Sequence, residues 1–149
     1  MNLSGRHEIA RPPEEVFRKL LDPEVVKSCI PGCESLVRSP DGSYHARIHA
    51  RYGILGGTFK GRVFIRDVVP SRGYTMDLEG GGMLGSIRGT TRVSIEPREG
   101  GAASEVSFAS EIALGGLLGK IGERIVPGSA GEFSAKFFQD LERAMGEVP

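Results

Sequence analysis

The chain holds two cysteines, and both lie in one five-residue stretch, Cys29-Ile30-Pro31-Gly32-Cys33. Three residues separate the two thiols, whereas the dithiol motif of redox enzymes has two, and no second Cys/His pair completes a zinc site. A disulfide across the Pro-Gly turn is sterically possible but unexpected in a reducing cytoplasm. We therefore interpret the stretch as a junction between a helix and a strand, at the rim of the fold.

Three histidines are the other candidates for acid–base or metal chemistry. His45 and His49 would lie about 13 Å apart along a strand, too far to hold one ion. His7 shares a strand face with Leu3 and Ile9, so it is expected to point inward, as a hydrogen-bonded core residue, a base or a donor to a ligand carbonyl. No inward pair of carboxylates, nucleophile elbow or phosphate loop accompanies it. The sequence therefore predicts no metal site, no cofactor and no catalytic residue.

Composition and charge narrow the class of protein. With 149 residues, a single domain spanning 1–149 is expected. Nineteen acidic residues balance nineteen basic ones, which argues against a nucleic-acid binder. The first residues lack the apolar core of a secretory signal, and the longest uncharged apolar stretch, 112–119, is far shorter than the ~20 residues of a membrane-spanning helix. We therefore expect a cytoplasmic location.

The hydrophobic periodicity predicts an α+β fold. A short strand at 5–10 precedes helical patterns at 11–22 and 23–29, the first with prolines suited to a first helical turn. From Cys33 the period changes to two, and repeated turn signals divide the chain into six strands of an antiparallel meander. Helical spacing returns at 114–145, interrupted by Pro127-Gly128. The order is β-α-α-β6-α.

This order matches the helix-grip fold, a curved seven-stranded antiparallel sheet around a long C-terminal helix. The segments "GRHEIARPPEEVFRKLLDPEVVKSCIPGCESL", "GTFKGRV" and "GGMLGSIRGTTRVSIEP" resemble the carbon monoxide dehydrogenase G-subunit family of the SRPBCC/START-like superfamily. The resemblance implies an accessory protein of a molybdenum-containing carbon monoxide dehydrogenase or related hydroxylase, active in membrane recruitment, maturation or quinone handling. It also allows a peripheral contact at the inner face of the membrane.

Strand alternation assigns an inner face that mixes large apolar side chains with Ala46, Ala50, Gly61 and Gly89. Such small residues either let the closing helix approach the sheet or leave an apolar cavity; with the resemblance, we favour a cavity. The expected lining is Phe59, Ile65, Met76, Ile87, Val93, Phe108 and Ile112. His7 or Tyr74 would donate a hydrogen bond to a ligand carbonyl.

The turns differ between the two ends of the sheet. One end has polar turns, whereas the other presents apolar residues at positions that usually face water. We expect these residues to form the mouth of the cavity, with a simple cap on the core as the alternative. The expected rim is Tyr52, Ile54, Leu55, Met83, Leu84 and Leu118.

The outer face of the middle strands is charged. It carries His45, Arg47, His49, Arg51, Lys60, Arg62, Arg66, Asp77 and Glu79. Charge pairing across strands on a solvated face is one explanation. A basic patch for an acidic partner is the other.

The function expected from these patterns is binding of a hydrophobic small molecule without catalysis, and the resemblance makes a quinone or other isoprenoid lipid the preferred ligand. Two alternatives remain open. One is an enzyme of the polyketide cyclase or aromatase kind, and the other is a docking module with a solid core that binds the dehydrogenase.

Overall fold

The computed structural model describes residues 2–52 and 55–146, and side chains except those of 50–56 and 121–133. The elements are β1 (Asn2–Ile9), α1 (Pro13–Leu20), α2 (Pro23–Cys29), β2 (Cys33–Arg38), β3 (Tyr44–Tyr52), β4 (Leu55–Val69), β5 (Gly73–Gly82), β6 (Gly85–Arg98), β7 (Ala103–Gly115) and α3 (Leu117–Ala144), with a 3-10 turn at Glu99–Gly101. This order confirms the predicted β-α-α-β6-α arrangement.

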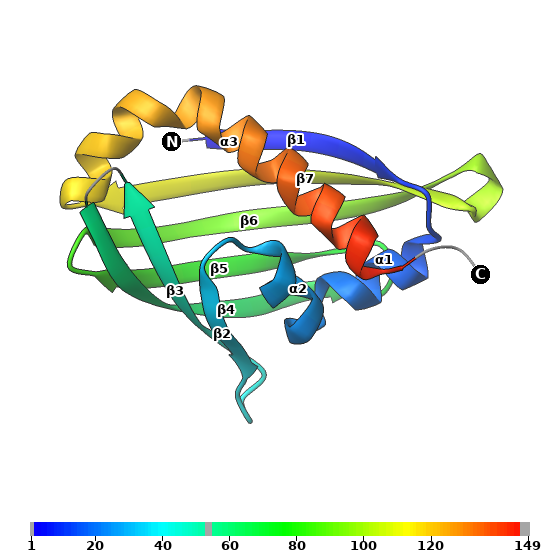
Figure 1. Cartoon of the computed structure of the whole chain (residues 1–149). Helices are drawn as coiled ribbons and strands as arrows, with labels where there is room; N and C mark the ends of the chain where they lie inside the picture. Colours follow the sequence, from blue (N-terminus) through cyan, green and yellow to red (C-terminus); the bar gives the residue numbers. More distant parts are fainter. Residues whose placement is uncertain (1, 53–54, 147–149) are drawn as a thin grey trace.

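The seven strands form one antiparallel sheet in the order β1-β7-β6-β5-β4-β3-β2. Strands β2 to β7 follow one another as a meander, and β1 pairs with β7 along its whole length. The sheet is strongly curved, and α3 crosses its inner face with α1 and α2 near the C-terminal end of that helix (Figure 1). The predicted helix-grip fold is therefore confirmed.

Local sequence explains how the first two helices begin. Helix α1 has Pro13 in its first turn, where a missing N–H removes no helical hydrogen bond. Helix α2 is capped by Asp22, whose side chain accepts a 3.0 Å hydrogen bond from the backbone N–H of Glu24. Such a cap stabilises a helix by about 1 kcal/mol.

Helix α3 runs without a break from Leu117 to Ala144, so the predicted interruption at Pro127-Gly128 is wrong. An internal proline removes one backbone hydrogen bond and crowds the preceding turn, and a helix can bend there instead of ending. The ribbon of α3 does change direction within its first half (Figure 1). The helix starts directly after β7 because Gly116 adopts φ 67°, which other residues rarely reach.

The buried core lies at the end of the sheet where α1, α2 and the second half of α3 meet. It consists of Ile9, Val16, Leu20, Cys29, Tyr74, Val93, Ile95, Val106, Phe138 and Leu141. Every strand residue in this set belongs to the face that alternation assigned to the interior. The helices therefore attach to the sheet mainly at this one end.

Contacts between neighbouring strands explain why some inner positions are glycine, a reason that neither sequence-based interpretation included. A Cβ atom at Gly80 would lie 2.9 Å from the carbonyl oxygen of Lys60, and one at Gly89 would lie 2.6 Å from that of Glu111. At Gly61 the nearest backbone oxygen would be 3.3 Å away. Ordinary Cβ contacts are longer, so these glycines let adjacent strands approach closely enough for the sheet to bend.

Replacing Gly89 with alanine should therefore lower the free energy of unfolding by about 1–3 kcal/mol, the usual cost of overpacking. Gly57→Ala is the matched control, because its Cβ would make ordinary 3.5 Å contact with the Leu84 side chain. Urea unfolding of both variants measures the difference. Equal stabilities would show that the glycines are not required by the curvature.

Candidate functional site

The inner face of the sheet is covered unevenly. Near α1 and α2 its apolar side chains are buried in the core described above. Toward the start of α3, the inward apolar side chains keep part of their surface exposed. These are Ile48, Phe59, Val63, Ile87, Ile112 and Leu114. We call this set the open inner face.

The predicted lining residues divide between these two regions. Val93 is 8% exposed and belongs to the core. The partly buried side chains of Ile65, Met76 and Phe108 pack against that core. Only Phe59, Ile87 and Ile112 belong to the open inner face. The predicted lining residues that stay outside the core and its packing shell therefore lie in the half of the sheet away from α1 and α2.

His7 points inward, as expected, and lies in an aromatic cluster. Its ring stacks on Phe138, with 4.4 Å between centroids, and lies parallel to Phe108 at 6.4 Å. A Cβ at Gly5 would be 3.8 Å from His7 Nε2, so this nitrogen faces the neighbouring inner position of β1, on the side away from the buried Ile9.

The polar atoms of His7 remain available to a ligand. Among the described residues no side chain hydrogen-bonds to its ring, yet no buried side-chain nitrogen or oxygen lacks a partner. The ring nitrogens therefore reach accessible surface. Burial lowers the pKa of His7 below its usual value, so at neutral pH the imidazole is neutral, with one nitrogen that donates and one that accepts.

Tyr74, the other predicted donor, lies in the buried core. It is 5% exposed, and its ring meets Phe17 edge to face at 6.2 Å. Burial, followed by the nearby Tyr44, raises its pKa, which keeps the phenol protonated. Because the partly exposed His7 is more accessible, it is the better candidate for contact with a ligand.

The predicted mouth residues are only partly placed. Met83 is 97% exposed, whereas its neighbour Leu84 is buried. The backbone N–H of Leu118 donates a 2.8 Å hydrogen bond to the carbonyl of Leu84, so the start of α3 and the β5–β6 turn meet at this end. The side chains of Ala50, Arg51, Tyr52 and Leu55, and all of Ile54, lie outside the described residues.

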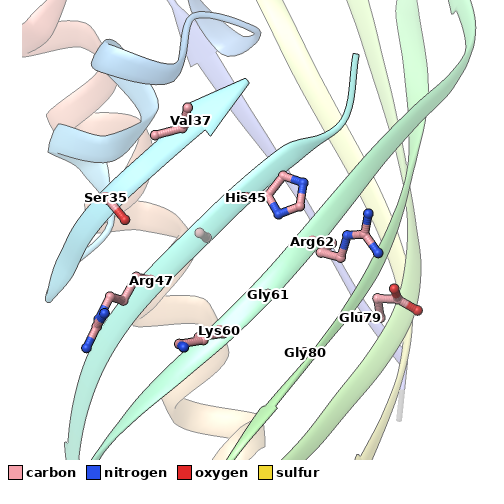
Figure 2. A pocket seen from close by; sticks show the side chains of 10 residues that line it. Ser35, Val37, His45, Arg47, Lys60, Gly61, Arg62, Glu79 and Gly80 are labelled. Atoms are coloured by element: carbon pink, nitrogen blue, oxygen red, sulfur yellow. The ribbon is translucent and has the colours of Figure 1, made fainter. Parts of the chain in front are cut away.

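The opposite face of the sheet carries a groove of about 470 Å³ (Figure 2). It crosses β2, β3, β4 and β5. Its lining is Ser35, Val37, His45, Ala46, Arg47, Lys60, Gly61, Arg62, Glu79 and Gly80. We call it the outer groove. It is separated from the open inner face by the thickness of the sheet.

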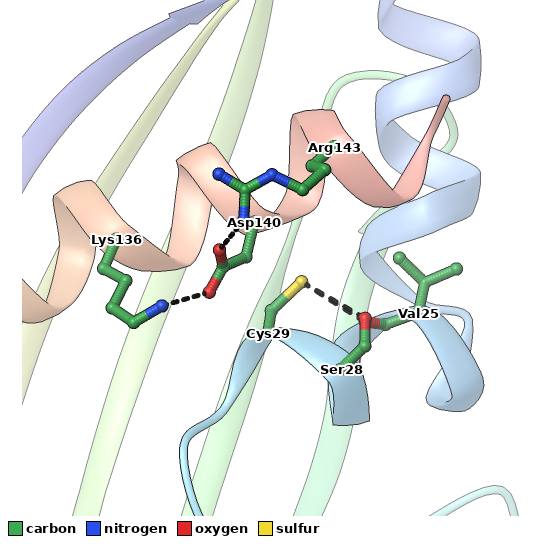
Figure 3. A network of polar contacts seen from close by, with 6 residues as sticks. All are labelled: Val25, Ser28, Cys29, Lys136, Asp140 and Arg143. Atoms are coloured by element: carbon green, nitrogen blue, oxygen red, sulfur yellow. Dashed lines mark hydrogen bonds and ion pairs between the residues drawn. The ribbon is translucent and has the colours of Figure 1, made fainter. Parts of the chain in front are cut away.

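The stretch Cys29–Cys33 joins α2 to β2, as predicted. Its expected position at the rim is wrong for Cys29, which is 1% exposed and belongs to the core. Cys29 Sγ donates to the carbonyl of Val25 at 3.3 Å, beside Asp140 of α3 (Figure 3). The periodicity of α2 alone could not show this, because the burial of Cys29 depends on how α3 packs.

Both thiols are free, and burial raises the pKa of each. Since the thiolate is the reactive form, neither cysteine is activated as a nucleophile.

Asp140 forms ion pairs with Lys136 at 2.9 Å and with Arg143 at 3.3 Å, so its charge is neutralised within α3 (Figure 3). Among the residues whose side chains are described, no three His, Cys, Asp or Glu side chains gather as metal ligands do. Among the same residues, no helix combines the length and apolarity needed to span a bilayer.

Comparison with known proteins identifies the family of this chain. A family model that describes the G subunit of carbon monoxide dehydrogenase (CoxG) matches residues 5–146. A search of curated proteins found no match to this chain.

Solved structures share the fold. A conserved protein from Geobacillus kaustophilus is 24% identical, with a TM-score of 0.88 over 96% of this chain and 93% of that chain. TTHA0849 from Thermus thermophilus is 19% identical, with a TM-score of 0.68 over 97% and 96%. CV1439 from Chromobacterium violaceum is 18% identical, with a TM-score of 0.66 over 99% of both chains. At these identities the similarity establishes the fold alone.

The lowered pKa of His7 predicts a pH-dependent loss of stability. The unfolded chain takes up a proton at His7 as the pH falls through about 6.5, while the folded chain takes it up only at lower pH. Acidification from neutral pH to below 6.5 should therefore destabilise the native protein more than it destabilises the His7→Phe variant. Melting temperatures of both at about pH 7.5 and 5.5 test this. A difference between the two proteins that stays constant across this range would contradict it.

Proposed function

Because the chain belongs to the carbon monoxide dehydrogenase G-subunit family, we propose that it is a binding protein that serves a molybdenum-containing carbon monoxide dehydrogenase-like enzyme. Its open inner face holds a hydrophobic small molecule, a quinone or comparable isoprenoid lipid. The protein itself catalyses no reaction.

The partly exposed apolar side chains of the open inner face carry this proposal. Ile48, Phe59 and Ile87 lie on three different strands and point to the side of the sheet that α3 crosses. Covering apolar surface contributes roughly 25 cal/mol for each Å² removed from water. A protein that left these side chains uncovered would forgo that gain, whereas a ligand between the sheet and α3 would supply it.

The position of His7 suits a ligand with a carbonyl group. Its neutral imidazole offers one N–H, and its ring nitrogens reach accessible surface at the boundary between core and open inner face. A quinone combines a flat apolar ring with carbonyl oxygens that accept hydrogen bonds. Phe108 and Phe138 would provide aromatic surface beside that ring.

The polar groups in the interior favour binding over catalysis. The hydroxyls of Thr91 and Ser110 hydrogen-bond each other at 2.8 Å, so each satisfies the other. Tyr74 is kept protonated by its surroundings. General acid–base catalysis needs an ionisable group with a pKa near the working pH, which the protonated Tyr74 does not supply. The accessory role of the protein rests on its family membership.

Native mass spectrometry of protein purified gently from its own host, followed by organic extraction, tests the proposal. We expect a co-purifying quinone or isoprenoid lipid. Protein that is purified without a bound ligand, and that also fails to bind added menaquinone and fatty acids, would contradict the proposal. That result would favour a docking module with a solid core. If the native protein converts an added polyketide and the His7→Phe variant does not, the result would favour the cyclase alternative.

A pair of adjacent substitutions locates the ligand. Ile87 points into the open inner face, and Arg88 is exposed on the outer face of the same strand. We expect Ile87→Trp to fill the binding space and to weaken menaquinone binding roughly tenfold or more, measured by titration calorimetry. Arg88→Trp adds the same side chain on the other face and should change the affinity less than about twofold. Equal affinities for both variants would place the ligand elsewhere.

A further inference from the structure

The outer groove concentrates positive charge. His45 lies directly opposite Arg62 on the neighbouring strand, and Arg47 lies directly opposite Lys60. The four side chains occupy a grid with about 5 Å between strands and about 7 Å along each strand. Figure 2 shows them on the same side of the ribbon. The floor between the two rows is made by residues without long side chains, Ala46, Gly61 and Gly80.

The position of Arg47 opposite Lys60 is unfavourable for the isolated protein. Like charges directly opposite each other on antiparallel strands destabilise a sheet. The expected charge pairing across strands does occur further along β4, where Arg66 binds Asp77 at 2.6 Å. In the groove, Arg47 has a 3.5 Å contact with Glu34, and both of these side chains are about half exposed.

The other two fixed cations of the grid are less well neutralised. Glu79 is the cross-strand neighbour of Arg62, but within the described part of the chain neither Lys60 nor Arg62 forms an ion pair. The Arg62 guanidinium lies instead over the ring of Phe64, 5.4 Å from its centroid. Positive charge that is only partly neutralised within the fold is typical of a surface that meets an acidic partner.

We propose that the outer groove is a docking site for an extended acidic segment of a partner protein. Alternate side chains of an extended chain are about 7 Å apart, which equals the spacing of Lys60 and Arg62 along β4. Several carboxylates of one segment can therefore each meet a different cation. The exposed Val37 at the β2 side of the groove offers an apolar contact to the same segment.

The groove is less suited to a single phosphate. Phosphate sites combine converging cations with free backbone N–H groups, usually at a helix N-terminus or in a nest. Here the cations are spread over two strands that are both internal to the sheet, so their backbone N–H groups are used in the ladder. The groove also lies on the opposite face from the open inner face. Partner docking is therefore independent of the ligand proposed above, and either can fail without the other.

Fluorescence anisotropy with a labelled eight-residue peptide of alternating Glu and Thr tests the docking site. We expect the native protein to bind this peptide, to lose affinity as salt is added, and not to bind the same peptide with Gln in place of Glu. Lys60→Gln/Arg62→Gln should weaken binding roughly tenfold. The double variant should be at least as heat-stable as the native protein, because it relieves the like-charged pair of Arg47 and Lys60.

Arg18→Gln/Arg92→Gln is the matched control. It removes the same charge from exposed residues that do not line the groove, and it should change the peptide affinity less than about twofold. Equal weakening by both double variants would show a general charge effect and overturn the proposal. Absence of peptide binding would overturn the proposal and show that the groove is not a docking site. Peptide binding that an equal concentration of tripolyphosphate abolishes would overturn it in favour of a small-anion site.

Discussion

Backbone of neighbouring strands occupies the space that a Cβ atom would need at Gly80 and Gly89, and almost does so at Gly61. This close approach lets a seven-stranded sheet curve around α3 instead of remaining open and flat. The same geometry shapes both sides of the sheet. It makes the inner face concave toward the helix, and it leaves the outer rows of long charged side chains separated by a floor of small residues.

The buried core and the open inner face occupy different parts of the inner side of the sheet. At one end, α1, α2 and the second half of α3 bury a continuous apolar cluster that includes Tyr74 and Val93. At the other end, Phe59 and Ile87 keep accessible surface. His7 lies between these regions, with its ring held by Phe138 and its nitrogens accessible. A ligand at the open end would therefore add to a core that is already complete.

Some features of the site could be predicted from the sequence and others could not. Period-two alternation correctly assigned Val93 and Phe59 to the same face, because side-chain direction follows from the strand itself. It could not show that one is buried and the other partly exposed, since that depends on which helix lies above each residue. Met83 and Leu84 share one turn and similar apolarity, yet the first is exposed and the second packs beside Gly57. The helical pattern likewise placed a break at Pro127, where the helix in fact continues.

By itself the sequence determined the order of the elements, the two faces of each strand, the helix–strand junction at Cys29–Cys33 and the inward direction of His7. These properties arise from hydrophobic period, turn residues and proline, which act within a few residues of chain. Only the tertiary structure decided the depth of burial, the backbone contacts that require Gly80 and Gly89, and the register that places His45 opposite Arg62 and Arg47 opposite Lys60. Each of these depends on segments distant in sequence, because covering a surface or pairing two strands is a property of both partners together.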